Sequence, residues 1–455
     1  MIVNPYIFRE YDIRGKVLED FPPEVVVLLG RAFGTLVKRS AGREIAISGD
    51  IRNTTPDLIN YFKEGVLSTG VDIINLGIVP TPVNYYSLYK LDVAASVQIT
   101  GSHNPPEFNG FKLSLHKKPV YGEQIQLLKK SIDDLDFDSG DGSETRYKIL
   151  PDYNQMILNK IRIDRPMKVV MDCGNAAASI NAPKIFTELG VNLTELYCEP
   201  DGSFPNHHPD PTVEENLLDL ISLMKTGEYD VGIAFDGDAD RLGVVDERGE
   251  IIWADQLIAL FLPEIIKPGD KIIYDVKCSK ALEDMIKKYK GEPIMWKTGH
   301  SLIKNKMAES DCKLGGEMSG HIFFADDYFG YDDAIYVAAR LIQMLSKTDK
   351  TLSELKSVIP IYHSTPEIRL EAESDEEKFK IAKLAVEYFT ENYNCNTIDG
   401  VRIQYENGWG LVRASNTQPV IVCRFEGDTL ERMNEIKSIV LEKLQEFGTL
   451  NISAH

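Results

Sequence analysis

Short apolar runs alternate with helical stretches along most of the chain. Three of these runs share one form, in which a charged residue precedes a short apolar strand and an Asp or Gly opens the following loop; they lie at 44–50, 168–174 and 271–277. Continuous apolar strands between helices are typical of parallel sheets covered on both faces. Because the form recurs about every hundred residues, it predicts three related mixed α/β domains.

The pattern changes after residue 366, where two long helices with one apolar face each are expected. Ser374 and Glu377 form a capping box at the start of the first, and Asp428 and Glu431 stand in the same relation in the second. Their apolar stripes belong to a core rather than a cofactor site, and they comprise Phe379, Ala382, Val386 and Phe389, then Met433, Ile436, Val440 and Leu444. This region predicts a smaller α+β domain.

Breaks in composition divide the chain. The segment 136–143 is acidic, glycine-rich and aperiodic, which is typical of a linker or loop. A second break follows the strand and turn at 244–249, and a third lies at 360–366, where we also expect a hinge. The predicted domains are 1–147, 148–249, 250–362 and 363–455.

Composition limits the possible function classes. The chain has 455 residues, of which 43% are hydrophobic and 26% charged, as in globular proteins of three to four domains. A formal net charge of −20 argues against nucleic-acid or anionic-membrane partners. The six cysteines are scattered, without a Cys-x-x-Cys pair, and no signal peptide or membrane-spanning run is seen, so we expect reduced thiols and a cytoplasmic location.

A glycine-framed serine follows an apolar strand at 93–99. Ser102 lies in Thr-Gly-Ser-His-Asn-Pro, and the following Pro105 and Pro106 favour a stiff, tight bend at a strand end. An ordinary polar turn is the alternative. A hydrolase fits poorly, because there is no Gly-x-Ser-x-Gly elbow and adjacent residues of an extended chain point to opposite sides, so His103 is badly placed as the base for Ser102.

An acidic loop offers three carboxylates at alternating positions, namely Asp236, Asp238 and Asp240. Oxygen ligands of this kind suit a hard cation, and we expect Mg²⁺. A calcium-binding EF-hand is the rival, but its sixth position needs glycine and is Arg241 here, and the flanks 230–235 and 242–245 predict strands rather than helices. A solvated acidic turn is the remaining alternative.

A magnesium site with three carboxylates favours phosphoryl transfer. Three carboxylates and a phosphate outweigh one divalent cation, so cationic side chains must complete the site. Each candidate could also be a surface charge, although Lys277 ends an apolar strand, where lysine is costly; the candidates are Arg14, Lys112, Arg241 and Lys277. The loop 315–321 suits sugar hydroxyls or is a plain glycine-rich turn, and 413–419 combines an arginine with short polar side chains, which suits a phosphate.

Taken together and in this order, the motifs resemble those of the α-D-phosphohexomutase superfamily, most closely its bacterial phosphomannomutase/phosphoglucomutase branch. The resemblance spans nearly the whole chain, and it rests on the segments 11–15, 100–105, 236–241, 296–301, 315–321 and 413–419. It implies three similar mixed α/β domains and a smaller fourth one around a central cleft. It also implies a reversible shift of phosphate between C6 and C1 of a hexose through a phosphoserine and a 1,6-bisphosphate intermediate.

The resemblance also implies roles for single residues. Ser102 would carry the phosphoryl group, and Mg²⁺ would be held by Asp236, Asp238 and Asp240 with a phosphoserine oxygen. Lys112 is favoured as the principal acid or base, with His103 and Arg14 as further catalytic candidates. The remaining candidates would contact the substrate, and they are Tyr11, Arg241, Lys277, His300, Glu317, Ser319, His321, Arg413, Ser415, Asn416 and Thr417.

Other functions stay open at this point. A magnesium-dependent sugar-phosphate phosphatase shares the acidic loop, and a non-catalytic sugar-phosphate or calcium binder would not need Ser102. Within the family, phosphoglucosamine mutase is the nearest rival, although Met318 favours mannose or glucose phosphates. A monomer or weak dimer is expected. One departure from the family is the sequence Ser48-Gly49-Asp50, followed by Arg52, where many members have Gly-Arg-Asp.

Overall fold

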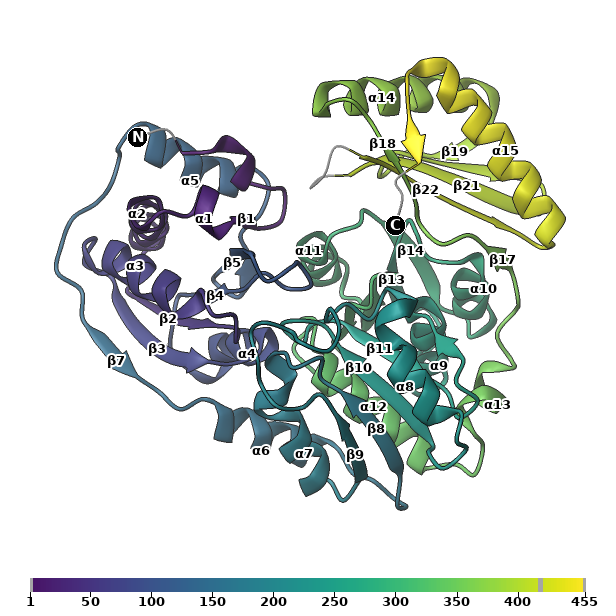
Figure 1. Cartoon of the computed structure of the whole chain (residues 1–455), viewed down its shortest axis with the longest axis horizontal. Helices are drawn as coiled ribbons and strands as arrows, with labels where there is room; N and C mark the ends of the chain where they lie inside the picture. Colours follow the sequence, from purple (N-terminus) through teal and green to yellow (C-terminus); the bar gives the residue numbers. More distant parts are fainter. Residues whose placement is uncertain (1–2, 416–419, 453–455) are drawn as a thin grey trace. The chain divides into compact units, whose positions relative to one another are not determined.

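The structure is a computed structural model, and it describes residues 3–415 and 420–452. The chain forms two compact units. The first contains the residues up to 254 together with Ser319–Lys356, and the second contains Asp255–Met318 and the residues from 357 onward. The predicted third domain, 250–362, is therefore divided between the units: helices α12 (Ala334–Ser346) and α13 (Leu352–Lys356) belong to the first (Figure 1).

The first sheet has the strand order β1-β5-β4-β2-β3-β7, with β6 paired to β5. Its strands are β1 (Ile13–Lys16), β2 (Glu44–Gly49), β3 (Asp72–Ile78), β4 (Ala95–Ile99), β5 (Phe108–Leu115), β6 (Lys118–Pro119) and β7 (Glu144–Arg146). Its helices are η1 (Pro5–Ile7), α1 (Val17–Asp20), α2 (Pro23–Arg39), α3 (Thr55–Leu67), α4 (Thr81–Lys90) and α5 (Glu123–Asp133).

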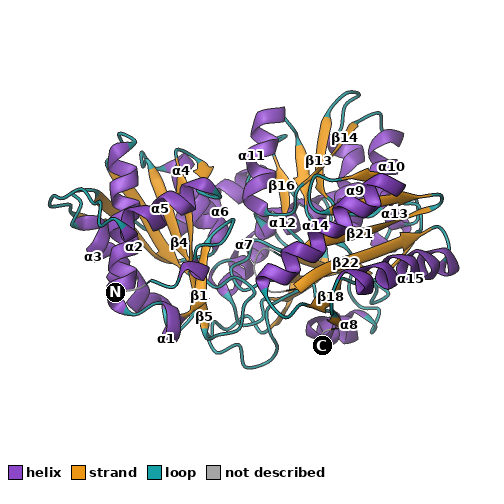
Figure 2. Ribbon diagram, turned by 90° about the horizontal axis from the view of Figure 1, so that it is seen from above, coloured by secondary structure: helices purple, strands orange, loops and turns teal. Residues whose placement is uncertain are grey.

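Side chains of β2 point alternately to the two faces of this sheet, and helices cover both faces (Figure 2). Ile45 and Ile47 point into the core shared with α2, α3 and α5. Ser48 points to the opposite face, where its Oγ accepts a hydrogen bond of 2.6 Å from Asn84 of α4. Successive strand residues face opposite sides, so an apolar run such as β2 requires a helix layer on each face.

The second sheet has the order β12-β11-β10-β8-β9. Helix α8 packs on the face formed by Val170, Ala234 and Val245, and α12 also contacts β10 and β11. The elements are α6 (Leu150–Lys160), β8 (Lys168–Asp172), η2 (Ala177–Ile180), α7 (Ala182–Glu188), β9 (Asn192–Leu196), η3 (Glu214–Leu217), α8 (Leu218–Met224), β10 (Val231–Phe235), β11 (Leu242–Val245) and β12 (Ile251–Ile252). The strand β16 (Ile322–Phe324) also belongs to the first unit.

The second unit contains the order β14-β13-β15 and the C-terminal sheet. The first part comprises α9 (Ala254–Ile265), β13 (Lys271–Asp275), α10 (Lys280–Lys288), β14 (Glu292–Trp296), α11 (His300–Ser310) and β15 (Leu314–Gly316). The C-terminal sheet has the order β19-β20-β21-β22-β18-β23, with β17 on β22. Its elements are β17 (His363–Ser364), β18 (Ile368–Glu371), α14 (Asp375–Asn392), β19 (Asn394–Asn396), β20 (Val401–Tyr405), β21 (Gly408–Ala414), β22 (Val420–Gly427), α15 (Leu430–Phe447) and β23 (Asn451–Ile452).

The predicted threefold repeat is confirmed by strand order. The three runs at 44–50, 168–174 and 271–277 form β2, β8 and β13, and each lies between two parallel neighbours. In each sheet the central strand pairs on one side with the next strand in the sequence and on the other side with the strand after that. The resulting orders are β4-β2-β3, β10-β8-β9 and β15-β13-β14. The loops after these three strands consequently hold equivalent places in three related sheets.

The two long C-terminal helices are confirmed, but details of both predictions are wrong. Ser374 caps α14 as expected, accepting a hydrogen bond from the Glu377 amide, and Phe389 of the predicted stripe is buried. Phe379, however, is 54% exposed, and Ile381 and Ala385 are buried instead. The cap of α15 is Thr429 rather than Asp428. Both errors have one cause, because a shift of one residue changes the helix face and several neighbouring residues are compatible caps.

The acidic segment 136–143 is a loop, as predicted, but it does not separate the first sheet from its neighbours. Arg39 donates hydrogen bonds to Asp136 and Asp138, and the following β7 pairs with β3 of the same sheet. Similarly, His363 and Ser364 of the expected hinge already pair with β22. The domain boundaries remain predictions. In the described part of the chain no helix is long and apolar enough to cross a membrane.

Helices α2 and α3 cross at two glycines, which generates a test of the packing. A Cβ at Gly65 would lie 2.1 Å from the carbonyl oxygen of Val27, and one at Gly30 would lie 2.2 Å from that of Phe62. We expect Gly65→Ala to lower the free energy of unfolding by about 2 kcal/mol or more, because the backbones must separate. Thermal and urea unfolding measure this. The control is Glu64→Ala on the exposed side of α3, and an equal stability of the two variants would contradict the tight crossing.

Candidate active site

The serine loop connects β4 to β5, and the predicted tight bend is confirmed. Ser102 is buried and has a φ of +49°, in the left-handed region that non-glycine residues rarely adopt. The Thr100 hydroxyl donates to Asp50 at 2.7 Å and accepts from the Ser102 amide at 2.9 Å. Asp50 follows β2, so the end of one apolar strand fixes the loop at the end of its neighbour.

Arg52 holds the backbone of the serine loop, a role that the sequence analysis did not identify. Its buried guanidinium pairs with Asp50 and donates hydrogen bonds to four carbonyl oxygens of the serine loop, those of Ser102, Asn104, Pro105 and Phe108, at 2.6–3.1 Å. A planar donor fork suits several converging acceptors. The Asp-x-Arg spacing after a buried strand was the available sequence signal.

The acidic loop lies between β10 and β11, which are antiparallel. Strands on both sides confirm the predicted flanks and exclude the EF-hand. Neighbouring elements fix the loop: Thr81 of α4 donates to Asp238 at 2.5 Å, and the amides of Ala177 and Ala334 donate to the carbonyls of Gly237 and Ala239. Since its backbone is satisfied by protein groups, the loop holds its carboxylates in a buried, fixed arrangement.

The serine and acidic loops meet directly. The Ser102 hydroxyl donates to Asp236 Oδ2 at 3.0 Å. A Cβ on Gly237 would lie 2.1 Å from the Ser102 carbonyl oxygen, so the contact requires glycine at that position. Segments 134 residues apart therefore form one site.

The three carboxylates fit a divalent cation. Asp236, Asp238 and Asp240 are fully buried, and oxygen atoms from the three lie within 4.8 Å of one another. Among the described residues, Oδ1 of Asp238 and of Asp240 are buried without a hydrogen-bond partner. Burial, reinforced by the other two carboxylates, raises the pKa of Asp236 well above its usual value. A hard cation with a preference for oxygen would satisfy these atoms and offset the repulsion.

Lys112 of β5 supplies positive charge to this cluster. Its Nζ lies 2.7 Å from Asp238 and 2.5 Å from Asp240. Burial opposes the charged form, but the carboxylates outweigh it and raise the pKa of Lys112 above its ordinary value. Lys112 therefore stays an ammonium group, suited to charge stabilisation rather than to accepting a proton.

The expectation that His103 points away from Ser102 is wrong. Its Nδ1 lies 3.3 Å from the Ser102 Oγ, because the left-handed backbone at Ser102 replaces the extended geometry on which the expectation rested. Burial, with help from nearby Arg241 and Arg14, lowers the pKa of His103 well below its usual value, so the ring is neutral. Arg14 donates a hydrogen bond of 3.1 Å to Asn104 of the serine loop. Tyr11, which precedes Arg14 in the same segment, is half-buried.

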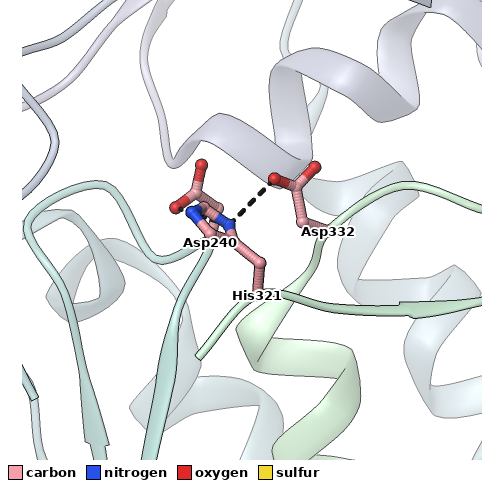
Figure 3. Close-up of side chains that lie close together, drawn as sticks. All are labelled: Asp240, His321 and Asp332. Carbon is pink, nitrogen blue, oxygen red and sulfur yellow. Dashed lines mark ion pairs between the residues drawn. The ribbon is translucent and has the colours of Figure 1, made fainter. Parts of the chain in front are cut away.

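Arg241, which directly follows Asp240 of the acidic loop, contacts His321. The Arg241 Nε donates to His321 Nε2 at 3.0 Å. His321 Nδ1 lies 3.0 Å from Asp332 and 3.5 Å from Asp240 (Figure 3). The Leu242 amide, which donates to the carbonyl of Gly320 at 3.2 Å, joins this segment to β11. Ser319, at the start of the segment, is half-buried.

The second unit brings together the remaining described candidates. Asp275, at the end of β13, accepts hydrogen bonds from Thr298 at 3.1 Å and from the Met318 amide at 3.2 Å. The Gly299 amide donates to Glu317. Because His300 follows Gly299 and begins α11, this contact joins the start of the helix to Glu317 in the loop 315–321. Lys277 pairs with Glu367 at 2.6 Å.

Asp399 links Arg413 to the loop that contains Thr298. It accepts from the Thr298 amide and from Arg413 Nε, both at 3.0 Å. The carbonyl of Ser415 accepts from Lys378 at 2.9 Å, while Asn416 and Thr417 lie outside the described residues. Asp275, Glu367 and Asp399 were missed, since a single acidic residue carries no motif until its partners are known.

Known families match the chain throughout. The models of phosphoglucomutase/phosphomannomutase match in order: alpha/beta/alpha domain I at 5–139, domain II at 151–249, domain III at 253–362 and the C-terminal domain at 367–443. The phosphomannomutase/phosphoglucomutase of Pseudomonas aeruginosa is 45% identical over 441 residues, 96% of this chain and 95% of that protein. The phosphoglucomutase of Neisseria meningitidis is 41% identical over 447 residues, covering 95% and 96%.

A solved structure agrees in fold and sequence. The X-ray structure of a phosphoglucomutase/phosphomannomutase family protein from Burkholderia thailandensis has a TM-score of 0.93 at 39% identity. The match covers 99% of this chain and all of the other.

The hydrogen bonds between Arg52 and the serine loop, here called the Arg52 clamp, lead to a mutational test. We expect Arg52→Lys to lower kcat about tenfold or more with a smaller change in KM, because one ammonium group cannot replace the fork that fixes the Ser102 backbone. Steady-state kinetics measure both constants. The matched control is Arg39→Lys, whose side chain is 45% exposed and also binds carboxylates. A kcat equal to that of the control would refute the clamp.

Proposed function

Because this chain belongs to the phosphoglucomutase/phosphomannomutase family, we propose that its phosphohexomutase reaction uses Ser102 as the phosphoryl carrier. The supporting observation is the buried hydroxyl on a left-handed bend, 3.0 Å from Asp236 of a three-carboxylate loop. A serine held so close to a cation site can carry a phosphoryl group without a hydrolase triad.

The proposed cycle has two matched transfers. In the first, the bond between phosphorus and Ser102 Oγ breaks, a bond forms to the free C1 or C6 hydroxyl of the hexose monophosphate, and the hydroxyl proton leaves. The product is a hexose 1,6-bisphosphate. In the second, its other phosphoryl group returns to Ser102, and the displaced sugar oxygen regains a proton. Mg²⁺ held by Asp236, Asp238 and Asp240 would supply charge neutralisation at the transferred group.

The nitrogen groups near Ser102 suit different tasks. Lys112 is kept cationic by two carboxylates, so we assign it to charge stabilisation; its role as principal acid or base stays a prediction. His103 is neutral and hydrogen bonds Ser102. The Nε2 of His321 already accepts a hydrogen bond from Arg241, so we propose the neutral His103, rather than His321, as the acceptor of the sugar hydroxyl proton.

We assign recognition of the sugar and its distal phosphate to the loops of the second unit and to Ser319. Glu317 and Ser319 would bind sugar hydroxyls with His300 nearby, while Lys277, Arg413 and Ser415 would hold phosphate. Asp399 supports this assignment, since it fixes the Arg413 side chain at Nε. Tyr11, Arg14 and Arg241 complete the proposed contacts, together with Asn416 and Thr417.

Both mannose and glucose phosphates are the proposed substrates, as the name of the P. aeruginosa relative states for that protein. Glucosamine phosphate is the alternative within the family. We further propose a cytoplasmic location, and a monomer or weak dimer.

Replacement of Ser102 separates the candidate functions. We expect Ser102→Ala to reduce kcat at least about a thousandfold, because the proposed cycle has no other phosphoryl carrier. A coupled assay with mannose 1-phosphate, glucose 1-phosphate and glucosamine 1-phosphate, including Mg²⁺ and catalytic 1,6-bisphosphate, measures turnover and ranks the sugars. The control is Ser203→Ala, an exposed serine of the same unit. Full turnover by S102A, or release of inorganic phosphate as the main product of the wild type, would contradict the mutase.

Replacement of Arg413 tests whether remote phosphate binding assists the reaction. We expect Arg413→Ala to raise KM and to lower kcat, each about tenfold, because binding energy at the distal phosphate would drive closing of the site. The control is Arg432→Ala in the same C-terminal region, where the arginine pairs with Glu435. A raised KM with an unchanged kcat would count against closing.

A further inference from the structure

Two cysteines of the second sheet have their sulfur atoms in contact. The Cys198 Sγ lies 3.2 Å from the Cys173 Sγ, and both are free thiols. We propose that this pair is an oxidation site: a small hydroperoxide converts the two thiols to a disulfide, which disturbs the serine loop and lowers turnover until the bond is reduced. The effect on turnover rests on the proposed function, whereas the formation of the bond does not.

The backbone brings the two sulfurs together at the ends of adjacent parallel strands. Asp172 of β8 pairs with Leu196 of β9, so Cys173 directly follows one strand and Cys198 lies two residues beyond the other. Tyr197, between them on the second strand end, has a φ of +51°. This left-handed residue ends the extended alternation of β9, and the next side chain reaches Cys173.

Asn175 fixes the backbone on both sides of Cys198. Its main-chain amide donates to the carbonyl of Tyr197 at 2.7 Å, and its side-chain amide donates to the carbonyl of Glu199 at 2.8 Å. Because Asn175 follows Cys173 by only two residues, these bonds hold the two thiols side by side. A disulfide bond is about 2.05 Å long, so the sulfurs must approach by about 1.2 Å for the bond to form.

The two thiols differ in exposure, which determines the order of the reaction. Cys198 is half-buried, whereas Cys173 is fully buried. Burial, reinforced by the neighbouring Cys198, raises the pKa of Cys173 well above its usual value, so this group is a protonated thiol in the reduced protein. Thiolate character and access control cysteine oxidation. A hydroperoxide therefore reacts first with Cys198, and Cys173 is the resolving thiol.

The chemistry is a two-electron oxidation that balances with one hydroperoxide. With hydrogen peroxide, the Cys198 thiolate attacks one oxygen, the O–O bond breaks, and the departing hydroxide takes up a proton to form water, leaving a sulfenic acid. The Cys173 sulfur then attacks the Cys198 sulfur. The S–O bond breaks, the S–S bond forms, and hydroxide leaves with the Cys173 proton as a second water. A dithiol reductant reverses the oxidation by thiol–disulfide exchange.

The segment that follows Cys198 lies against the serine loop. The Phe204 ring lies 5.1 Å from the Arg52 guanidinium, and His208 contacts the carbonyl oxygen of His103. Arg52 in turn holds the carbonyl oxygens of the serine loop. A displacement of this segment therefore acts on the serine loop both directly and through Arg52.

Asn175 connects the thiol pair to that segment and to the acidic loop. Its side-chain oxygen accepts from Asn206 at 2.7 Å, and two residues further on the Ala177 amide donates to the carbonyl of Gly237 at 3.3 Å. Drawing the sulfurs together consequently displaces groups that support both loops of the proposed site. A misplacement of about 1 Å can lower a rate about a hundredfold, and we expect the disulfide to reduce kcat about tenfold or more.

Cys395 provides a matched control for Cys198. Both are half-buried, and each Sγ lies 3.3 Å from a backbone carbonyl oxygen, that of Phe389 for Cys395 and that of Leu196 for Cys198. Cys395 lies in β19 of the second unit, whereas both members of the pair lie in the first. The comparison thus separates oxidation of a half-buried thiol in general from oxidation of this pair.

The test treats the full chain with hydrogen peroxide and then with dithiothreitol, and it compares wild type with Cys198→Ser and Cys395→Ser. Mass spectrometry of the intact chain and of its non-reduced peptides detects the bond, and the coupled assay measures kcat. In wild type and C395S we expect a disulfide between Cys173 and Cys198, a loss of kcat of about tenfold or more, and recovery on reduction. C198S should form no such bond and keep its kcat within about twofold after the same treatment.

Each result decides one question. A wild-type chain that forms no bond between Cys173 and Cys198, or an equal loss of kcat in C198S and wild type, would overturn the oxidation site. A disulfide that leaves kcat unchanged would overturn its connection to the serine loop. Reduced wild type without mutase turnover on any of the three sugar phosphates would instead contradict the proposed function, and the mass spectra alone would then decide whether the bond forms. If C198S does not fold, Cys198→Ala is judged by the same measurements.

Discussion

Three carboxylates buried on one short loop impose the strongest constraint on the first unit. Asp236, Asp238 and Asp240 lie too close to share negative charge without compensation, and burial with mutual repulsion raises the pKa of Asp236. Lys112 offsets part of the charge. The backbone hydrogen bonds around the loop fix its shape and keep the three carboxylates close together, and a divalent cation would complete the charge balance.

The serine loop contains a second unfavourable feature, a strained backbone conformation, which contacts with neighbouring residues offset. A non-glycine residue in the left-handed region is disfavoured by about 1–2 kcal/mol, and Ser102 adopts that conformation. Arg52 binds four carbonyls of the loop, and Asp50 fixes both Arg52 and Thr100. The left-handed backbone directs the hydroxyl towards Asp236, which accepts its hydrogen bond at 3.0 Å.

The sequence was sufficient where the signal is local. Apolar runs predicted β2, β8 and β13, and two prolines predicted the bend at Ser102. It was insufficient where a property depends on partners far along the chain. Arg52 contacts carbonyls 50 to 56 residues away, and Asp399 contacts a loop 101 residues away. His103 was misplaced because the positive φ of Ser102 reverses the extended geometry, and no motif reveals that sign.

Three nitrogen-containing side chains around the proposed site differ in charge and hydrogen bonding because their surroundings differ. Lys112 is held cationic by carboxylates, whereas His103 is kept neutral by burial and nearby arginines. His321 accepts a hydrogen bond from Arg241 at Nε2, and its Nδ1 lies 3.0 Å from Asp332. A phosphoryl transfer in both directions requires a fixed positive charge beside a neutral group that can accept a proton. The fold places the fixed charge and the neutral group on different elements, so the two tasks fall to separate side chains.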